Sequence, residues 1–192
     1  MYPNKLGGSM TLRIAAAIAA VIFLILGIIQ GNMDAAEWWA PHYFGSDLIF
    51  WLQVFPAILI VLVLVGDRNL DLIASFGFLS QTLYIVVTTF KNNDADEFFL
   101  SLSSIMNNGF VNTLLALLII YMVLHDGRTA RLAGTFATVI AAYFAAASLF
   151  YTFYLLGESH TGYQRVGAIA EVMFFLAAIF VANAFKMERS NN

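Results

Sequence analysis

The chain contains no cysteine, only three prolines and three histidines, and few charged residues, which make up 11% of the composition. The absence of cysteine excludes disulfide bonds, thiolate catalysis, cysteine-ligated zinc and iron–sulfur clusters. The small net charge of −3 argues against a nucleic-acid partner, because such a partner requires a basic surface. Hydrophobic residues make up 61% of the 192 positions, more than one soluble core would bury. We therefore expect a membrane protein, with lipid as its solvent.

Six long hydrophobic segments divide the chain. They run over about 12–30, 48–65, 70–90, 98–124, 132–156 and 166–185. Each has about 20 residues, as a helix needs to cross about 30 Å of hydrocarbon, and each is too long for a barrel strand. The sequence predicts an all-α integral membrane protein whose six transmembrane helices form a single domain over residues 1–192.

The start of the chain allows two interpretations. Lys5 and Arg13 precede or open the first hydrophobic segment, a pattern that also fits a cleaved signal peptide. We favour a retained helix, because the segment is long and five more follow it. Either Met1 or Met10 can serve as the initiator, and the sequence does not decide between them.

The basic residues are distributed unequally between the two ends of the predicted helices. Seven of the nine fall on the side of the N-terminus, whereas Lys91 and Arg165 fall on the other side. The seven are Lys5, Arg13, Arg68, Arg128, Arg131, Lys186 and Arg189. By the positive-inside rule, we expect a multi-pass protein of the cell membrane with both termini in the cytoplasm.

The first outer loop, predicted over 31–47, is rich in large aromatic residues. They are Trp38, Trp39, Tyr43 and Phe44. Aromatic rings of this kind settle at the level of the lipid headgroups. We therefore predict a short interfacial segment in this loop, lying on the outer leaflet.

Two of the predicted helices carry stripes of small residues. The helix at 132–156 has Ala137, Ala141, Ala145, Ser148 and Thr152 on one face, and the helix at 12–30 has Ala16, Ala20 and Gly27. Small residues allow helix backbones to approach closely in lipid. Packing within the chain is our interpretation of both stripes. The alternative is that Ala16, Ala20 and Gly27 form a docking surface for another membrane protein.

A polar stripe distinguishes the first half of the helix at 98–124. Its members, spaced by three, four and four residues, share one helix face: Ser101, Ser104, Asn108 and Asn112. Other predicted helices place polar groups at neighbouring depths: Gln53 and Glu171 in the outer half of the bundle, and Gln81 and Tyr143 near its middle. Polar groups in lipid are costly unless they pair with each other, with water or with a ligand.

Glu171 is the member of this set that most suggests function, because it is a carboxylate inside a predicted span. The amides of Gln81, Asn108 and Asn112 are its expected partners. Two interpretations follow from the shared depth of these groups. One is an outer-half cavity that binds a ligand, and the other is a set of contacts that hold the helices together.

The sequence contains no motif typical of the common catalytic, haem or metal sites. Gly157–His160 reads Gly-Glu-Ser-His, but adjacent serine and histidine cannot adopt the geometry of a catalytic triad. No two histidines lie within one predicted helix to bind haem or a metal pair, and no phosphate-binding loop or zincin motif is present. We predict neither enzymatic activity nor a cofactor or metal.

The leading functional hypothesis is a binding or transport component for a small neutral or proton-coupled molecule. Its ligand residues would be Ser104, Asn108, Asn112, Gln81, Gln53, Tyr143 and Glu171. The alternatives are a non-catalytic accessory subunit of a larger membrane complex and, more weakly, an immunity or sensor protein. The layout of six helices with inward termini and an outward site resembles the substrate-binding subunits of energy-coupling-factor vitamin transporters. The likeness is one of plan, and no residue role follows from it.

Overall fold

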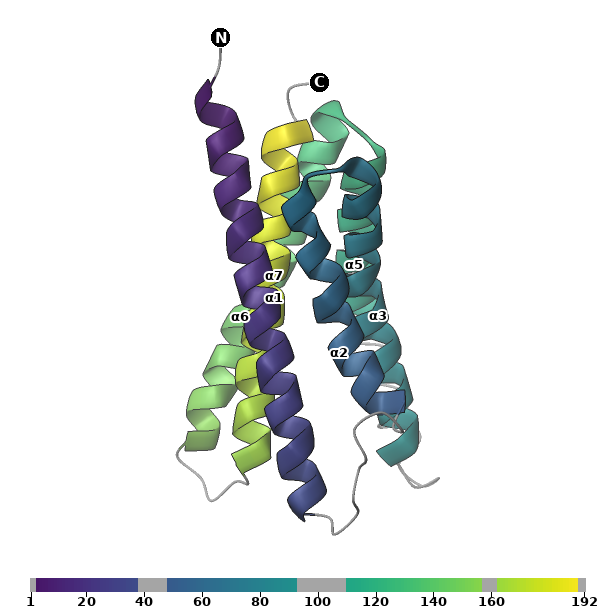
Figure 1. Ribbon diagram of the computed structural model, residues 1–192, viewed down its shortest axis with the longest axis vertical. Coiled ribbons are helices and arrows are strands. Elements are labelled where there is room, and N and C mark those ends of the chain that lie inside the picture. The colour runs from purple at the N-terminus through teal and green to yellow at the C-terminus, as the bar shows by residue number, and fades with distance from the viewer. Residues whose placement is uncertain (1–2, 38–47, 93–109, 157–161, 190–192) are drawn as a thin grey trace.

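The computed structural model of the chain describes residues 3–37, 48–92, 110–156 and 162–189, with the side chains of most of them. All secondary structure in this part of the chain is helical, with no strand, which confirms the all-α prediction. The elements are α1 (Pro3–Glu37), α2 (Leu48–Val61), the 3-10 helix η1 (Leu62–Val65), α3 (Arg68–Asn92), α5 (Phe110–Leu124), α6 (Gly127–Leu156) and α7 (Gly162–Arg189) (Figure 1).

Three of the helices are long and apolar enough to cross a membrane, over Gly8–Gln30, Gly127–Tyr154 and Arg165–Arg189. Large apolar side chains cover their outer faces, among them Phe136 and Phe150, which are exposed. So much exposed apolar surface is energetically unfavourable in water, whereas lipid tails accommodate it. The chain therefore has the character of a helical membrane protein.

The helices extend beyond the hydrophobic segments that predicted them. α1 covers Pro3–Glu37 rather than 12–30, so residues 31–37, predicted as loop, are helical. The segments predicted at 70–90, 132–156 and 166–185 are likewise extended, to Arg68–Asn92, Gly127–Leu156 and Gly162–Arg189. The reason is that backbone hydrogen bonds continue through polar residues that do not break a helix, so hydropathy underestimates helix length.

Two predicted features lie outside the described residues. They are the aromatic interfacial segment, of which 38–47 is not described, and the first part of the segment 98–124, of which α5 covers only Phe110–Leu124. The predicted segment 48–65 agrees with α2 followed directly by η1.

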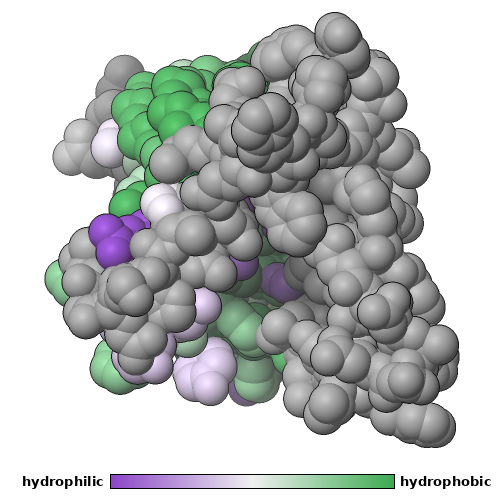
Figure 2. Space-filling model, turned by 90° about the horizontal axis from the view of Figure 1, so that it is seen from below, coloured by the Kyte–Doolittle hydropathy of each residue, from purple (hydrophilic) through white to green (hydrophobic). Residues whose placement is uncertain are grey.

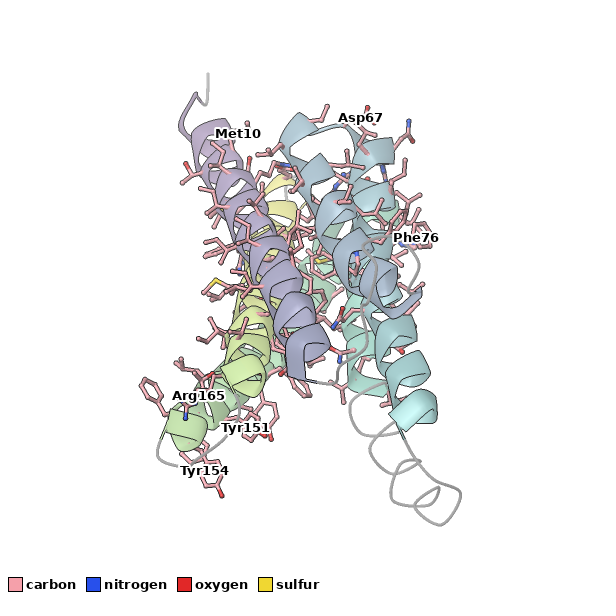
Figure 3. The ribbon with its side chains drawn as sticks, turned by 60° about the horizontal axis from the view of Figure 1, so that its bottom comes forward. Met10, Asp67, Phe76, Tyr151, Tyr154 and Arg165 are labelled. Carbon is pink, nitrogen blue, oxygen red and sulfur yellow. The ribbon has the colours of Figure 1, made fainter. Side chains whose placement is uncertain are left out.

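The helices form two groups that meet at one end of the molecule. One group contains α1, α6 and α7, in which α7 packs against both α1 and α6, and the other contains α2, α3 and α5 (Figure 1). α1 begins and α7 ends at the end where the groups meet, which we call the terminal end. Toward the opposite end, the far end, the two groups diverge. Tyr151, Tyr154 and Arg165 mark the far end, and Met10 and Asp67 mark the terminal end (Figure 3).

Small residues bring the helices of the first group together. Ala137, Ala141 and Ala145 of α6 are buried, and so are Ala16 and Ala20 of α1. Together with the burial of Ser148, Thr152 and Gly27, this confirms that both small-residue stripes pack within the chain. The surface that would have received a second protein on α1 is thus occupied by the molecule's own helices.

Candidate functional site

An aromatic contact joins the two helix groups near the middle of the molecule. The ring of Phe174 on α7 lies 5.4 Å from that of Phe23 on α1 and 5.5 Å from that of Phe78 on α3, measured between centroids. All three side chains are almost fully buried. This contact provides a reference level for the polar residues on the neighbouring turns.

Gln81 and Glu171 both lie one turn from this contact on the side of the far end. Gln81 follows Phe78 by three residues on α3, and Glu171 precedes Phe174 by three residues on α7. Residues three apart share a helix face. Since α3 runs toward the far end and α7 runs away from it, both side chains belong to the level just beyond the aromatic contact.

Asn112 on α5 reaches a similar level. Arg68 Nε donates a hydrogen bond of 2.8 Å to the carbonyl oxygen of Val123, which sets the register of α3 against α5. Counted from this bond at about 1.5 Å per residue, Gln81 lies about 20 Å along α3 and Asn112 about 17 Å along α5. The two amides therefore stand within one helical turn of each other in depth.

The amides of Gln81 and Asn112 are buried but incompletely bonded. Gln81 is 8% exposed and Asn112 is 6% exposed. Within the part of the chain that the structure describes, neither the Oε1 atom of Gln81 nor the Oδ1 atom of Asn112 has a hydrogen-bond partner. A buried polar atom without a partner costs about 1–3 kcal/mol. Each of these two oxygen atoms therefore needs a hydrogen-bond donor that the described residues do not supply.

The carboxylate of Glu171 is bonded on one side only. Ser148 Oγ on α6 donates to Glu171 Oε2 at 3.2 Å, and Thr152 Oγ1 donates to the carbonyl oxygen of Ser148 at 2.8 Å. Glu171 itself is exposed, although Phe174 and Phe175 on the next turn are buried. Seen from the far end, both hydrophilic and hydrophobic surface of the described residues is visible near the centre of the molecule (Figure 2).

The remaining predicted ligand residues do not join this site in the described structure. Asn108 and Ser104 lie outside the described residues, and Gln53 lies in α2 but its side chain is not described. Tyr143 is 69% exposed on α6 and meets the edge of the adjacent Phe144 ring. Five residues separate Tyr143 from Ser148, which sets the two side chains on nearly opposite faces of the helix. We therefore leave Tyr143 out of the site.

A second polar centre, which we had not predicted, lies at the terminal end. Arg13 of α1 is 3% exposed, and its five N–H groups are all used. Two bind the carboxylate of Asp71 on α3, at 2.6 and 2.8 Å, and two bind that of Glu188 on α7, at 2.8 and 2.6 Å. The fifth donates to the carbonyl oxygen of Val63 in η1 at 2.6 Å. The guanidinium also lies 5.3 Å from the ring centroid of Phe185.

Further arginines complete this centre, which we call the terminal ion cluster. Arg189 approaches Asp71 at 3.4 Å and Asp126 at 3.9 Å, and Arg68 approaches Asp126 at 3.6 Å. The cluster therefore contains Arg13, Arg68, Arg189, Asp71, Asp126 and Glu188, three positive and three negative charges. It joins α1 and α7 to α3 and to the turn between α5 and α6, so it connects the two helix groups where they meet.

The sequence contained a signal for this cluster. Arg13 and Asp71 are the second residues of the predicted segments 12–30 and 70–90, which both begin at the same side of the membrane. Opposite charges at equal depth in lipid are expected to pair. The sequence nevertheless does not predict the pair, because no pattern in it indicates that the helices of Arg13 and Asp71 are neighbours.

Comparison with protein-family models, with curated proteins and with solved structures found no match. The function is therefore inferred from the geometry of the two polar centres.

Proposed function

We propose that this chain is a binding or transport component of the cell membrane that takes a small molecule from the outer side. In this proposal six helices cross the bilayer, and the terminal end, with both chain termini, faces the cytoplasm. The ligand enters from the far end and is held at the level of Gln81, Asn112 and Glu171. Ser148 orients the carboxylate of Glu171 through its hydrogen bond.

The two unpartnered amide oxygens carry this proposal. An amide that only holds helices together is expected to be bonded within the protein. Asn183 in the terminal half behaves in this way, since its Nδ2 donates to Thr138 Oγ1 at 3.2 Å and to the carbonyl oxygen of Ile179 at 2.8 Å. The side-chain oxygens of Gln81 and Asn112 have no hydrogen-bond donor among the described residues, so a ligand or its water is the expected partner.

The arrangement of the helices supports uptake from the outer side. The terminal ion cluster holds the two groups together at the end assigned to the cytoplasm, and the groups diverge toward the other end. A complete transport cycle would require the cluster to separate so that the terminal end opens. The sequence has no ATP-binding motif, so ATP-driven transport would require a second protein.

Ligand binding can be tested by thermal unfolding of the purified protein in detergent across a panel of metabolites at pH 5 and pH 8. A ligand that binds only the folded protein raises the unfolding temperature in a concentration-dependent way. We expect a ligand of this kind and expect Asn112→Leu to weaken it at least tenfold.

Asn183→Leu is the matched control, because it removes an amide of the same kind from the opposite half of the bundle. It should leave ligand affinity unchanged. The proposal fails if no compound stabilises the folded protein, or if both variants weaken the ligand equally.

A further inference from the structure

Glu171 differs from Asp71 and Glu188 in having no basic partner among the described residues. Its one interaction there is the hydrogen bond from Ser148. The side chain is exposed, on the α7 face that holds the buried Phe174 and Phe175. A carboxylate at this depth in a membrane helix requires a proton, a cation or a positive side chain to neutralise it.

The terminal half of the same molecule shows how this chain neutralises carboxylates with its own residues. Asp71 has Arg13 and Arg189, and Glu188 has Arg13. Arginine is suited to this role because its charge persists in apolar surroundings and its N–H groups match carboxylate geometry. Glu171 has no arginine or lysine partner among the described residues, so a proton or a cation from outside this part of the chain must neutralise it.

The neighbouring groups favour a partner that donates hydrogen bonds. The free side-chain oxygens of Gln81 and Asn112 are acceptors, both residues are more than nine-tenths buried, and both stand at the level of Glu171 on other helices. The hydroxyl of Ser148, which is the nearby donor, is already used by Glu171. Acceptors on α3 and α5 and a carboxylate on α7 together match an ammonium group, which carries one positive charge and several N–H donors.

We propose that the ligand of this site is a small organic amine in its protonated form. This inference rests on the proposed function, and it specifies the chemical class of the ligand. The ammonium group binds the carboxylate of Glu171 and donates hydrogen bonds to the amide oxygens of Gln81 and Asn112. The apolar part of the molecule lies toward the aromatic contact of Phe78 and Phe174.

The test compares three series of compounds matched in size, by thermal unfolding and equilibrium dialysis of the purified protein at pH 7. The series are primary amines such as methylammonium to hexylammonium, the corresponding alcohols, and quaternary ammonium ions, which have the charge but no N–H donors. We expect saturable binding of at least one primary amine. The corresponding alcohol and quaternary ion should bind at least tenfold more weakly.

Three variants assign the binding to the site. Glu171→Gln and Asn112→Leu should each lower the affinity for the amine at least tenfold, and Asn183→Leu should leave it unchanged. A protonated Glu171 that needs no cation would be indicated if only alcohols or other neutral compounds bind and Asn112→Leu weakens them. That outcome would reject the amine as the ligand and retain the proposed binding site. If no compound of the three series or of the wider metabolite panel binds, both the amine and the binding function are rejected.

Discussion

Arg13 shows at the scale of one residue how a charge is accommodated in an apolar helix bundle. Its planar guanidinium has five N–H donors in a fixed arrangement, and here they bind Asp71, Glu188 and the carbonyl oxygen of Val63. Lysine has three donors on one nitrogen and cannot bind two carboxylates in this bidentate way. The contact with the Phe185 ring adds a cation–π interaction on the face of the guanidinium.

Replacement of this arginine should be strongly destabilising. We expect Arg13→Met to lower the free energy of unfolding by about 3–5 kcal/mol, because it leaves buried carboxylates without their principal partner. Addition of Asp71→Asn to this variant should recover part of the loss, because it removes one of the unpaired charges. Unfolding of the detergent-solubilised protein by denaturant measures both values.

Arg131 provides the control for that experiment, since it is an exposed arginine on α6. Its replacement by alanine should change stability by about 0.5 kcal/mol or less. Equal effects of Arg13→Met and Arg131→Ala would show that the terminal ion cluster does not stabilise the fold.

At the scale of helices, α2 and α3 depend on one glycine for their close approach. A Cβ atom placed on Gly77 would lie 2.8 Å from the carbonyl oxygen of Pro56, 3.0 Å from Ile60 Cγ1 and 3.1 Å from Leu59 Cβ. The first of these atoms belongs to the backbone of α2 and cannot move without shifting that helix. Close contact at Gly77 therefore positions α3, and with it Gln81 one turn further along.

We expect Gly77→Ala to destabilise the protein by about 1–3 kcal/mol through overpacking, although alanine is the better helix former. Gly8→Ala is the matched control, because its Cβ would meet only the mobile end of Met187 at 3.0 Å. That variant should be nearly neutral. Thermal unfolding in detergent measures the difference, and equal tolerance of both substitutions would contradict the close-packing explanation.

At the scale of the whole molecule, the two ends differ in charge and in packing. Basic and acidic side chains join the helix groups at the terminal end, whereas exposed aromatic residues such as Tyr151 and Tyr154 lie at the far end. Tyrosine favours the membrane interface, where its ring is apolar and its hydroxyl is hydrated. The difference is consistent with a far end at the outer surface of the membrane.

The orientation can be measured with single cysteines, because the natural chain has none and gives no background labelling. We expect Tyr154→Cys, at the far end of α6, to react in intact cells with a membrane-impermeant maleimide. Thr129→Cys, near the terminal end of the same helix, should react only after the membrane is permeabilised. The reverse pattern would place both termini outside and would reverse the direction of the proposed uptake.

The positions of Gln81, Asn112 and Tyr143 show which features of the candidate site could be predicted from the sequence. Gln81 and Asn112 were predicted to lie close in depth, because depth follows from counting residues along a helix, and both side chains are buried. Tyr143 was counted into the same depth and is exposed on another face of α6. The depth of a residue in the membrane follows from its position along its own helix. Whether its side chain faces the protein interior or the lipid depends on where the neighbouring helices lie.

Three properties could be predicted from the amino-acid sequence: the chain is helical, several of its helices are apolar enough to cross a membrane, and small residues on α1 and α6 pack inside. These properties follow from composition and periodicity within single segments. The pairing of Arg13 with Asp71 and Glu188, at sequence separations of 58 and 175 residues, could be found only from the folded structure. The same holds for Glu171, which has no basic partner among the described residues. The physical reason is that ion pairing depends on which helices are neighbours, and no local pattern specifies that.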